Sequence, residues 1–145
     1  MNIWKYLIVF IGVFSFFIAG CSNESSNELQ NEGNKILVEK RIGEENKYEH
    51  DKEITEDSTV QKAKDILNSI SWENAEVSMA YPPHYKFRFV DDKEQSGLIY
   101  HLWISPNKDK VELVIQGKGK YVQLSKSKST KLFETITGAK LSNVE

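Results

Sequence analysis

Histidines are the residues here best suited to metal binding or proton transfer, and their spacing argues against both roles. The chain has three of them, and His50 stands among acidic residues at positions 48–53. Neighbours along a strand point to opposite faces, so this cluster would not converge on one ion. His84 and His101 are predicted on one sheet face, about 13 Å apart at roughly 3.3 Å per residue. Because zinc needs ligand nitrogens about 2.0–2.1 Å away, we predict no metal site and no cofactor.

Paired carboxylates are a second arrangement that could do chemistry, as the acid and base of a hydrolase. Glu73 and Glu76 would have to face Asp91 or Asp92 across a cleft of about 5–10 Å, and their spacing does not favour that pairing. The sequence has no G-x-S-x-G elbow, G-x-G-x-x-G run or P-loop pattern. We therefore predict a non-catalytic protein, with an envelope hydrolase acting on wall or lipid substrates as the alternative.

Aromatic and basic residues form the candidate binding surface. Trp103 is predicted on the polar sheet face opposite Lys86, where a cation–π contact would contribute about 0.5–1 kcal/mol. The alternative is that another segment, such as the hairpin at 35–54, covers the tryptophan. A lysine patch near one end of the domain would attract lipid headgroups or an anionic wall polymer, although an ordinary solvated lysine face explains the same residues. The candidate surface comprises Trp103, Lys86, Arg88, His101, Lys118, Lys120, Lys126 and Lys128.

The amino-terminal segment predicts where the protein resides. After Lys5, residues 7–19 are almost wholly apolar, which is short for a membrane span of about 20 residues and typical of a secretory signal. The run ends in Ile18, Ala19, Gly20 and Cys21, which resembles the bacterial lipobox. The small residues let the chain lie extended in the signal peptidase. The thiol accepts a diacylglycerol, and cleavage then leaves the lipidated cysteine as the first residue. The alternative, an uncleaved anchor, leaves the placement of the one cysteine unexplained.

These patterns predict a signal peptide at 1–20, a disordered tether at 21–34, one domain at 35–138 and a tail at 139–145. The tether has one apolar residue, Leu29, and cannot offset its ordering entropy by burial. Two acyl chains give stable attachment to a membrane. Usage rich in Lys, Asn and Ile favours a Gram-positive bacterium, which places the anchor on the outer face of the cytoplasmic membrane.

Hydrophobic periodicity predicts the elements of the domain. Weak strands are expected at 35–42 and 47–54, followed by a helix at 58–70 that begins with a capping box of Ser58 and Gln61. From Trp72 the period changes to two, and Pro82-Pro83 ends that run. A second helix is expected after Ser129 as its cap, with Gly138 just past its end.

Four further strands predict a meander with one apolar face. The pairs that keep this face apolar are Phe89 with Tyr100, Phe87 with Leu102, Ile104 with Val111, Leu102 with Leu113, Ile115 with Val122 and Leu113 with Leu124. The last pair leaves Lys118-Gly119 as a two-residue turn. The fold class is therefore α+β: an antiparallel sheet of four to six strands with two short helices on one face.

The composition of the chain limits the classes of partner that it can bind. The chain is 39% hydrophobic and 28% charged, with a formal net charge of -2. This is enough apolar mass for one small core, and it excludes a strongly basic nucleic-acid binder. We expect a membrane-anchored binding or accessory domain whose partner is an envelope protein or an anionic wall polymer. A carrier of small ligands would need an apolar pocket between sheet and helices.

Several short fragments together resemble a known family. They are Trp72-Glu73-Asn74-Ala75, Pro82-Pro83-x-Tyr85-x-Phe87, Leu102-Trp103-Ile104-Ser105, Tyr121-x-x-Leu124 and Leu132-Phe133-x-x-x-Thr137-Gly138. In this order they are similar to the YhfM-like domain of small lipoproteins from Bacillus-type bacteria, over roughly residues 55–138. The resemblance implies the α+β fold and the lipid anchor. It implies no activity, because the family has no established one. This sequence differs from the family pattern at His84, where an acidic residue is common.

Overall fold

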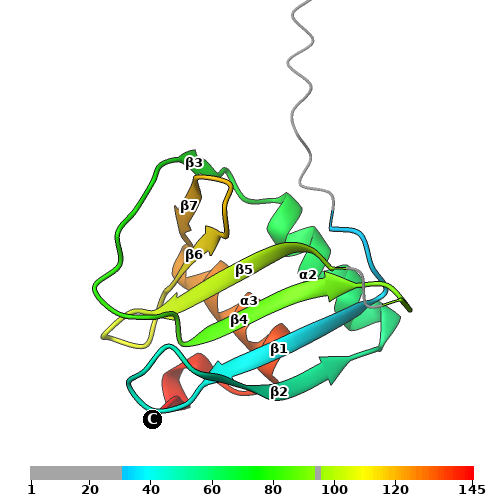
Figure 1. Ribbon diagram of the computed structural model, residues 1–145, viewed down its shortest axis with the longest axis horizontal. Coiled ribbons are helices and arrows are strands. Elements are labelled where there is room, and N and C mark those ends of the chain that lie inside the picture. Colours follow the sequence, from blue (N-terminus) through cyan, green and yellow to red (C-terminus); the bar gives the residue numbers. More distant parts are fainter. Residues whose placement is uncertain (1–30, 94–95) are drawn as a thin grey trace, which may run out of the picture.

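A seven-stranded antiparallel sheet organises the protein, with strand order β2-β1-β4-β5-β6-β7-β3. The computed structural model describes residues 31–93 and 96–145. One strand more is present than the four to six that the sequence predicts, because a short edge strand joins the sheet (Figure 1). The strands are β1 (Lys35–Arg41), β2 (Tyr48–Ile54), β3 (Glu73–Asn74), β4 (Tyr85–Val90), β5 (Ser96–Ile104), β6 (Val111–Ile115) and β7 (Lys120–Gln123).

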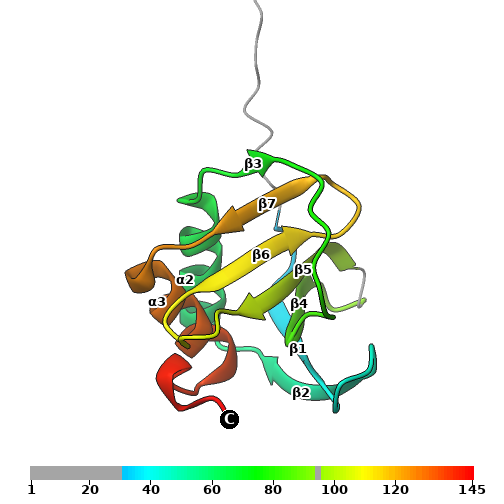
Figure 2. The same cartoon turned by 90° about the vertical axis from the view of Figure 1, so that its left-hand side faces the viewer.

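Two helices, α2 (Asp57–Asn68) and α3 (Lys126–Thr137), cover one face of this sheet (Figure 2). We call this side the inner face and the opposite side the outer face. The inner face holds the core, because the period-two pattern places every second residue of each strand against the helices. Residues with 2% exposure or less there include Phe87, Phe89, Tyr100, Leu102, Leu113, Ile115, Leu132, Phe133 and Ile136.

The predicted faces are confirmed, but two of the three predicted registers are wrong by two residues. β5 pairs with β6 as expected, with Ile104 opposite Val111. Phe87 lies opposite Tyr100 rather than Leu102, and Leu113 lies opposite Val122 rather than Leu124. A slip of two residues keeps every side chain on its face, so hydrophobic pattern does not distinguish these registers. The β6–β7 connection is consequently longer than the predicted two-residue turn.

The N-terminal caps of both helices differ from the predicted ones. Helix α2 begins after Glu56, whose carboxylate accepts hydrogen bonds from the Ser58 and Thr59 hydroxyls, so the predicted capping box does not form. Helix α3 is capped by Ser125, which accepts from the Lys128 amide. Ser129 instead lies buried within α3, where its hydroxyl accepts from the Val111 amide at 2.9 Å. Gly138 ends α3 at φ 73°, as predicted.

Residues at both ends of the described chain contact the sheet or the core. Asn31, expected in the tether, accepts a hydrogen bond from the Tyr100 hydroxyl at 2.5 Å. Leu141, expected in the tail, is 2% exposed and lies in the core cluster beside a 3₁₀ helix at Leu141–Asn143. The folded unit therefore extends beyond 35–138 on both sides.

The anchor segment lies outside the described residues, and with it the expected signal peptide, the lipobox and Cys21. Within residues 31–93 and 96–145, no helix has the length and apolar character needed to cross a bilayer.

Candidate functional site

A segment that we call the strap, residues 75–83, crosses the outer face of the sheet on its way from β3 to β4 (Figure 2). The sequence predicts a strand here, because Ala75, Val77 and Met79 alternate with polar residues. Strand structure ends instead at Asn74. The Ala75 amide bonds the Gly119 carbonyl, and within the described chain the backbone groups of residues 76–80 make no hydrogen bond.

Three side chains hold the far end of the strap by its successive carbonyls. The Trp103 indole donates to the carbonyl of Tyr81 at 2.8 Å. Arg41 Nη1 donates to the carbonyl of Pro82, and the Tyr48 hydroxyl donates to that of Pro83 at 2.7 Å. These donors come from β5, β1 and β2, so the strap is fixed at residues 81–83 by three strands.

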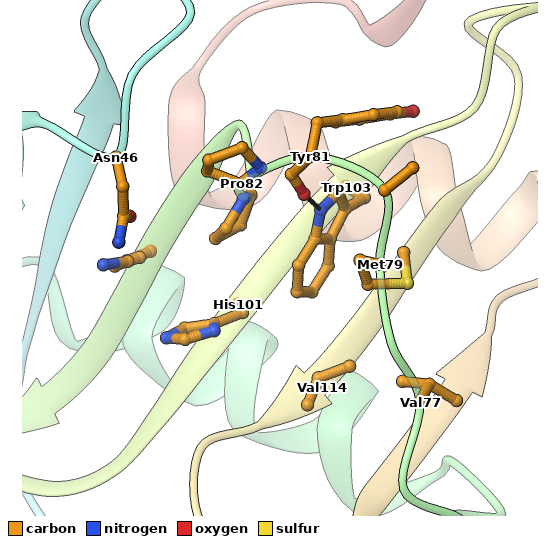
Figure 3. Close-up of a pocket in the computed structure, with 11 residues that line it drawn as sticks. Asn46, Val77, Met79, Tyr81, Pro82, His101, Trp103 and Val114 are labelled. Carbon is orange, nitrogen blue, oxygen red and sulfur yellow. Dashed lines mark hydrogen bonds between the residues drawn. The ribbon is translucent and has the colours of Figure 1, made fainter.

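An open groove with a volume of about 440 Å³ lies between the strap and the β1–β2 hairpin. Its floor is formed by Lys86 of β4, His101 and Trp103 of β5 and Val114 of β6. Figure 3 shows His101 and Trp103 between Asn46 of the hairpin on one side and Met79 of the strap on the other. We call this the strap groove; Val77 and residues 79–83 form its strap wall.

Trp103 is buried, at 6% exposure, so the alternative in which another segment covers it is the one that the structure supports. The covering segment is the strap, whose Tyr81 carbonyl accepts from the indole, and not the 35–54 hairpin. Glu112 lies opposite it on β6, but the two-residue register difference places His101, not Trp103, opposite Lys86. The His101 and Trp103 rings meet edge to face at 5.9 Å.

Lys86 makes its cation–π contact with a different aromatic residue. Its ammonium lies 3.8 Å from the centre of the Tyr48 ring. Glu39 is directly opposite Lys86 on β1, but that carboxylate pairs with Arg88 at 3.4 Å. Among the described residues, Lys86 therefore has no ion-pair partner.

The two outer-face histidines favour their neutral forms. Burial, then the charge of Lys86, lowers the pKa of His101, although its bond to Gln116 at 3.1 Å opposes this. Burial, then the Arg41 guanidinium, lowers the pKa of His84. The His84 Nδ1 accepts a hydrogen bond from the Ile104 amide at 3.1 Å, which requires the unprotonated nitrogen.

Two of the three large hydrophobic residues that are exposed in the described chain line this groove. Val77 and Tyr81 belong to the strap, at 38% and 46% exposure. Ile42, at 48% exposure, belongs to the β1–β2 hairpin, and Arg41 beside it bonds Pro82. Exposed apolar residues that gather at one place mark interaction sites more often than scattered ones do.

The predicted lysine patch is divided between two ends of the domain. Lys120 pairs with Ile115 at one end of β6 and donates to the Asn74 side chain. Lys126 pairs with Asp109 at 2.8 Å, before the other end of β6. From Asp109 to Ile115 the separation is about 20 Å at roughly 3.3 Å per residue. Lys128 is turned to the Ser69 carbonyl, at 2.7 Å, and Lys118 lies in the exposed β6–β7 turn.

The candidate catalytic carboxylates do not come together. Glu73 lies on β3 and Asp91 directly follows β4. These strands are four positions apart in the sheet, which is about 19 Å at 4.7–4.9 Å per strand. Asp92 lies 3.7 Å from Lys35, and Glu76 follows Ala75 at the β6–β7 turn. Within the described chain, no group of three His, Cys, Asp or Glu residues is placed to hold a metal ion.

Sequence reasoning thus found Lys86, His101 and Trp103, which the groove brings together, and missed its walls. The missing residues are the strap and Asn46. One signal was available: an apolar alternation that ends in Tyr81-Pro82-Pro83 cannot continue as a central strand. A tryptophan on the polar face of a sheet also needs a cover, and the strap supplies one.

Comparisons with known proteins support the fold and assign the family. A crystal structure described as a thioesterase-like protein from Clostridium sporogenes matches with a TM-score of 0.50 and 16% identity, over 73% of this chain and 95% of that one. At that identity the likeness shows the fold alone. No curated protein matches the sequence. The family described as YhfM protein matches residues 29–142, which adds the β1–β2 hairpin to the region identified by resemblance. This chain therefore belongs to the YhfM family.

Proposed function

We propose that this protein is a lipid-anchored, extracytoplasmic binding module without catalytic activity of its own, and that its binding site is the strap groove. The lipid at Cys21 holds the domain at the outer face of the cytoplasmic membrane, and the following residues give it reach. The observation that carries the proposal is the groove itself, because buried Trp103 forms part of its floor and the exposed residues Val77 and Tyr81 line its strap wall.

The composition of the groove favours recognition over catalysis. Its floor contains one imidazole, one ammonium and two apolar side chains. Catalysis of hydrolysis would need a nucleophile or a second proton-transferring group within hydrogen-bond reach of His101. The partner of that imidazole is instead the Gln116 amide, which does not titrate. The divided lysines give an anionic wall polymer no continuous track, so we favour an envelope protein as the partner.

The anchor is tested by mass spectrometry of the amino-terminal peptide from the membrane fraction. We expect a chain that begins at Cys21 and carries the mass of a diacylglycerol. The Cys21→Ala variant should lose that mass and leave the membrane fraction. An unmodified Cys21 on the mature wild-type protein would contradict the anchor.

The binding role is tested by chemical cross-linking on intact cells, followed by identification of the captured proteins. We expect the wild type to capture one membrane or envelope protein repeatedly, and Tyr81→Ser to capture it less. The Cys21→Ala variant should not capture it. Lys62→Gln, on the exposed side of α2 across the sheet from the groove, is the matched surface control. Capture that Tyr81→Ser leaves unchanged would contradict the groove as the binding site.

A further inference from the structure

We infer that the strap groove binds an extended peptide segment of its partner that carries an apolar side chain and an acidic one. This inference rests on the proposed function and names the chemistry of the partner. The apolar side chain would enter the groove over Trp103, the carboxylate would meet Lys86, and the backbone would lie along residues 76–80. Three separate features of the outer face carry the inference.

The first feature is the unpaired charge of Lys86. Its ammonium is positioned by the Tyr48 ring at 3.8 Å, and the nearest strand carboxylate, Glu39, pairs with Arg88. Within the described residues this ammonium makes no hydrogen bond or ion pair. An ammonium has three donors, and a carboxylate is the protein group that best satisfies them. The groove thus presents a fixed positive charge beside its apolar floor.

The second feature is the backbone of the strap. Residues 76–80 connect β3 to β4 outside any helix or strand, with a bend at Ala80, and their amides and carbonyls have no partner in the described chain. Glu76, Ser78 and Ala80 are exposed, which leaves this stretch accessible. Unpaired extended backbone is the element to which a peptide adds by strand pairing, and pockets beside it then select alternate side chains.

The third feature is the shape of the groove. It is an open groove and not a cavity closed around its contents. A small-molecule site normally encloses most of its ligand. An open groove with Trp103 as its floor and Met79 and Val77 on one wall is better suited to one or two side chains of a longer chain.

The test is selection from a phage-displayed library of random ten-residue peptides. The target is the full-length lipidated protein in neutral phosphatidylcholine vesicles, after depletion of the library on vesicles that carry Val77→Ser. We expect the enriched peptides to share an acidic residue close to an apolar or aromatic residue. A consensus peptide, made synthetically, is then titrated by fluorescence anisotropy.

Affinity for this peptide should fall about ten-fold or more with Lys86→Gln, which corresponds to the loss of one charge-assisted hydrogen bond. Lys118→Gln, in the exposed β6–β7 turn, is the matched control and should leave the affinity unchanged. Replacing the acidic residue of the peptide by its amide leaves the protein intact and should reduce binding to the wild type by a similar factor. The amide peptide should then bind wild type and Lys86→Gln alike.

Other outcomes would overturn the inference. Enriched peptides without an acidic residue, or a consensus peptide bound equally by Lys86→Gln, would remove the charge recognition and leave the groove as a binding site. If no peptide is enriched, and anilinonaphthalene sulfonate binds the wild type but not Lys86→Gln, the occupant is a small anion. The intact-cell cross-linking decides the proposed function separately, because it assumes no partner chemistry.

Discussion

The two faces of the sheet are built from the same strands but by different means. The inner face is closed by α2 and α3, and Phe87, Tyr100 and Leu102 on it are 1% exposed or less. The outer face is crossed by the strap, which is fixed by three side-chain hydrogen bonds at one end and leaves Val77 and Tyr81 partly exposed. Residues one position apart in β4, Lys86 and Phe87, therefore belong to different environments.

This difference separates stability from recognition. A closed apolar layer contributes most of the free energy of folding, since burial of area is its main source. A surface that keeps apolar side chains exposed gives up part of that contribution and becomes available to a partner. We expect substitutions on the inner face to change the free energy of unfolding, and substitutions on the strap to change binding.

The largest effect is expected from Phe87→Ala on the inner face. Phe87 is 1% exposed and stacks on Tyr100 with ring centres 4.9 Å apart. Removal of such a side chain costs about 3–5 kcal/mol, because the cavity does not close. Urea unfolding followed by circular dichroism measures this loss. A cost below about 1 kcal/mol would show that the inner face is not the stabilising layer.

A smaller effect is expected from Trp103→Phe, which removes the indole donor to the Tyr81 carbonyl and retains an aromatic ring. The loss of this bond should lower the free energy of unfolding by about 1–2 kcal/mol. Trp72→Phe is the matched control, because the buried Trp72 indole N–H has no partner in the described structure. Equal losses for the two variants would mean that the hydrogen bond to the strap contributes nothing.

The pH dependence of the free energy of unfolding reports on His84, which lies on the outer face. Its pKa in the folded protein lies below the ordinary value of 6.5. Between that lowered pKa and about 6.5, His84 binds a proton in the unfolded chain but stays neutral in the folded chain. Stability therefore falls as pH decreases from about 6.5. His84→Asn keeps an acceptor for the Ile104 amide and removes the titration. The urea midpoint should drop less for this variant than for the wild type between pH 7.5 and 5.5.

The smallest effect on stability is expected from Val77→Ser. Its side chain is 38% exposed on the strap, and surface substitutions of this kind usually change the free energy of unfolding by less than about 0.5 kcal/mol. Binding of the consensus peptide should nevertheless weaken. A variant that is destabilised as strongly as Phe87→Ala would contradict the division between the faces.

The sequence was sufficient for the faces of the strands and insufficient for their registers. Alternation in Tyr85, Phe87 and Phe89 determines which side of β4 is buried, because the side-chain period in a strand is two. The same period makes a shift of two residues invisible to pattern, which explains the errors at β4–β5 and β6–β7. Helix α3 was located by its buried residues, but its cap was misplaced because Ser125 and Ser129 are equally suitable by type.

The floor of the strap groove was predictable from the sequence and its strap wall was not, for a related reason. Lys86, His101 and Trp103 alternate with core residues, so the pattern places them together on the outer face. Residues 75–79 of the strap alternate as a strand would, and only Pro82-Pro83 argues against a central strand. The position of the strap depends on donors at residues 41, 48 and 103 that are distant in sequence. The lysines were predicted to form one patch because they are close in sequence. In the structure, Lys120 lies at one end of β6 and Lys126 lies near the other end.

The most direct test compares photo-cross-linkers placed on the two sides of the molecule. One replaces Ala80 on the strap, and the other replaces Lys62 on the exposed side of α2; both are carried by the full-length protein on intact cells. We predict that position 80 captures one envelope protein and that adding Lys86→Gln reduces this capture, while position 62 gives background. Equal capture from both positions, or capture from position 62 alone, would contradict the assignment of binding to the outer face.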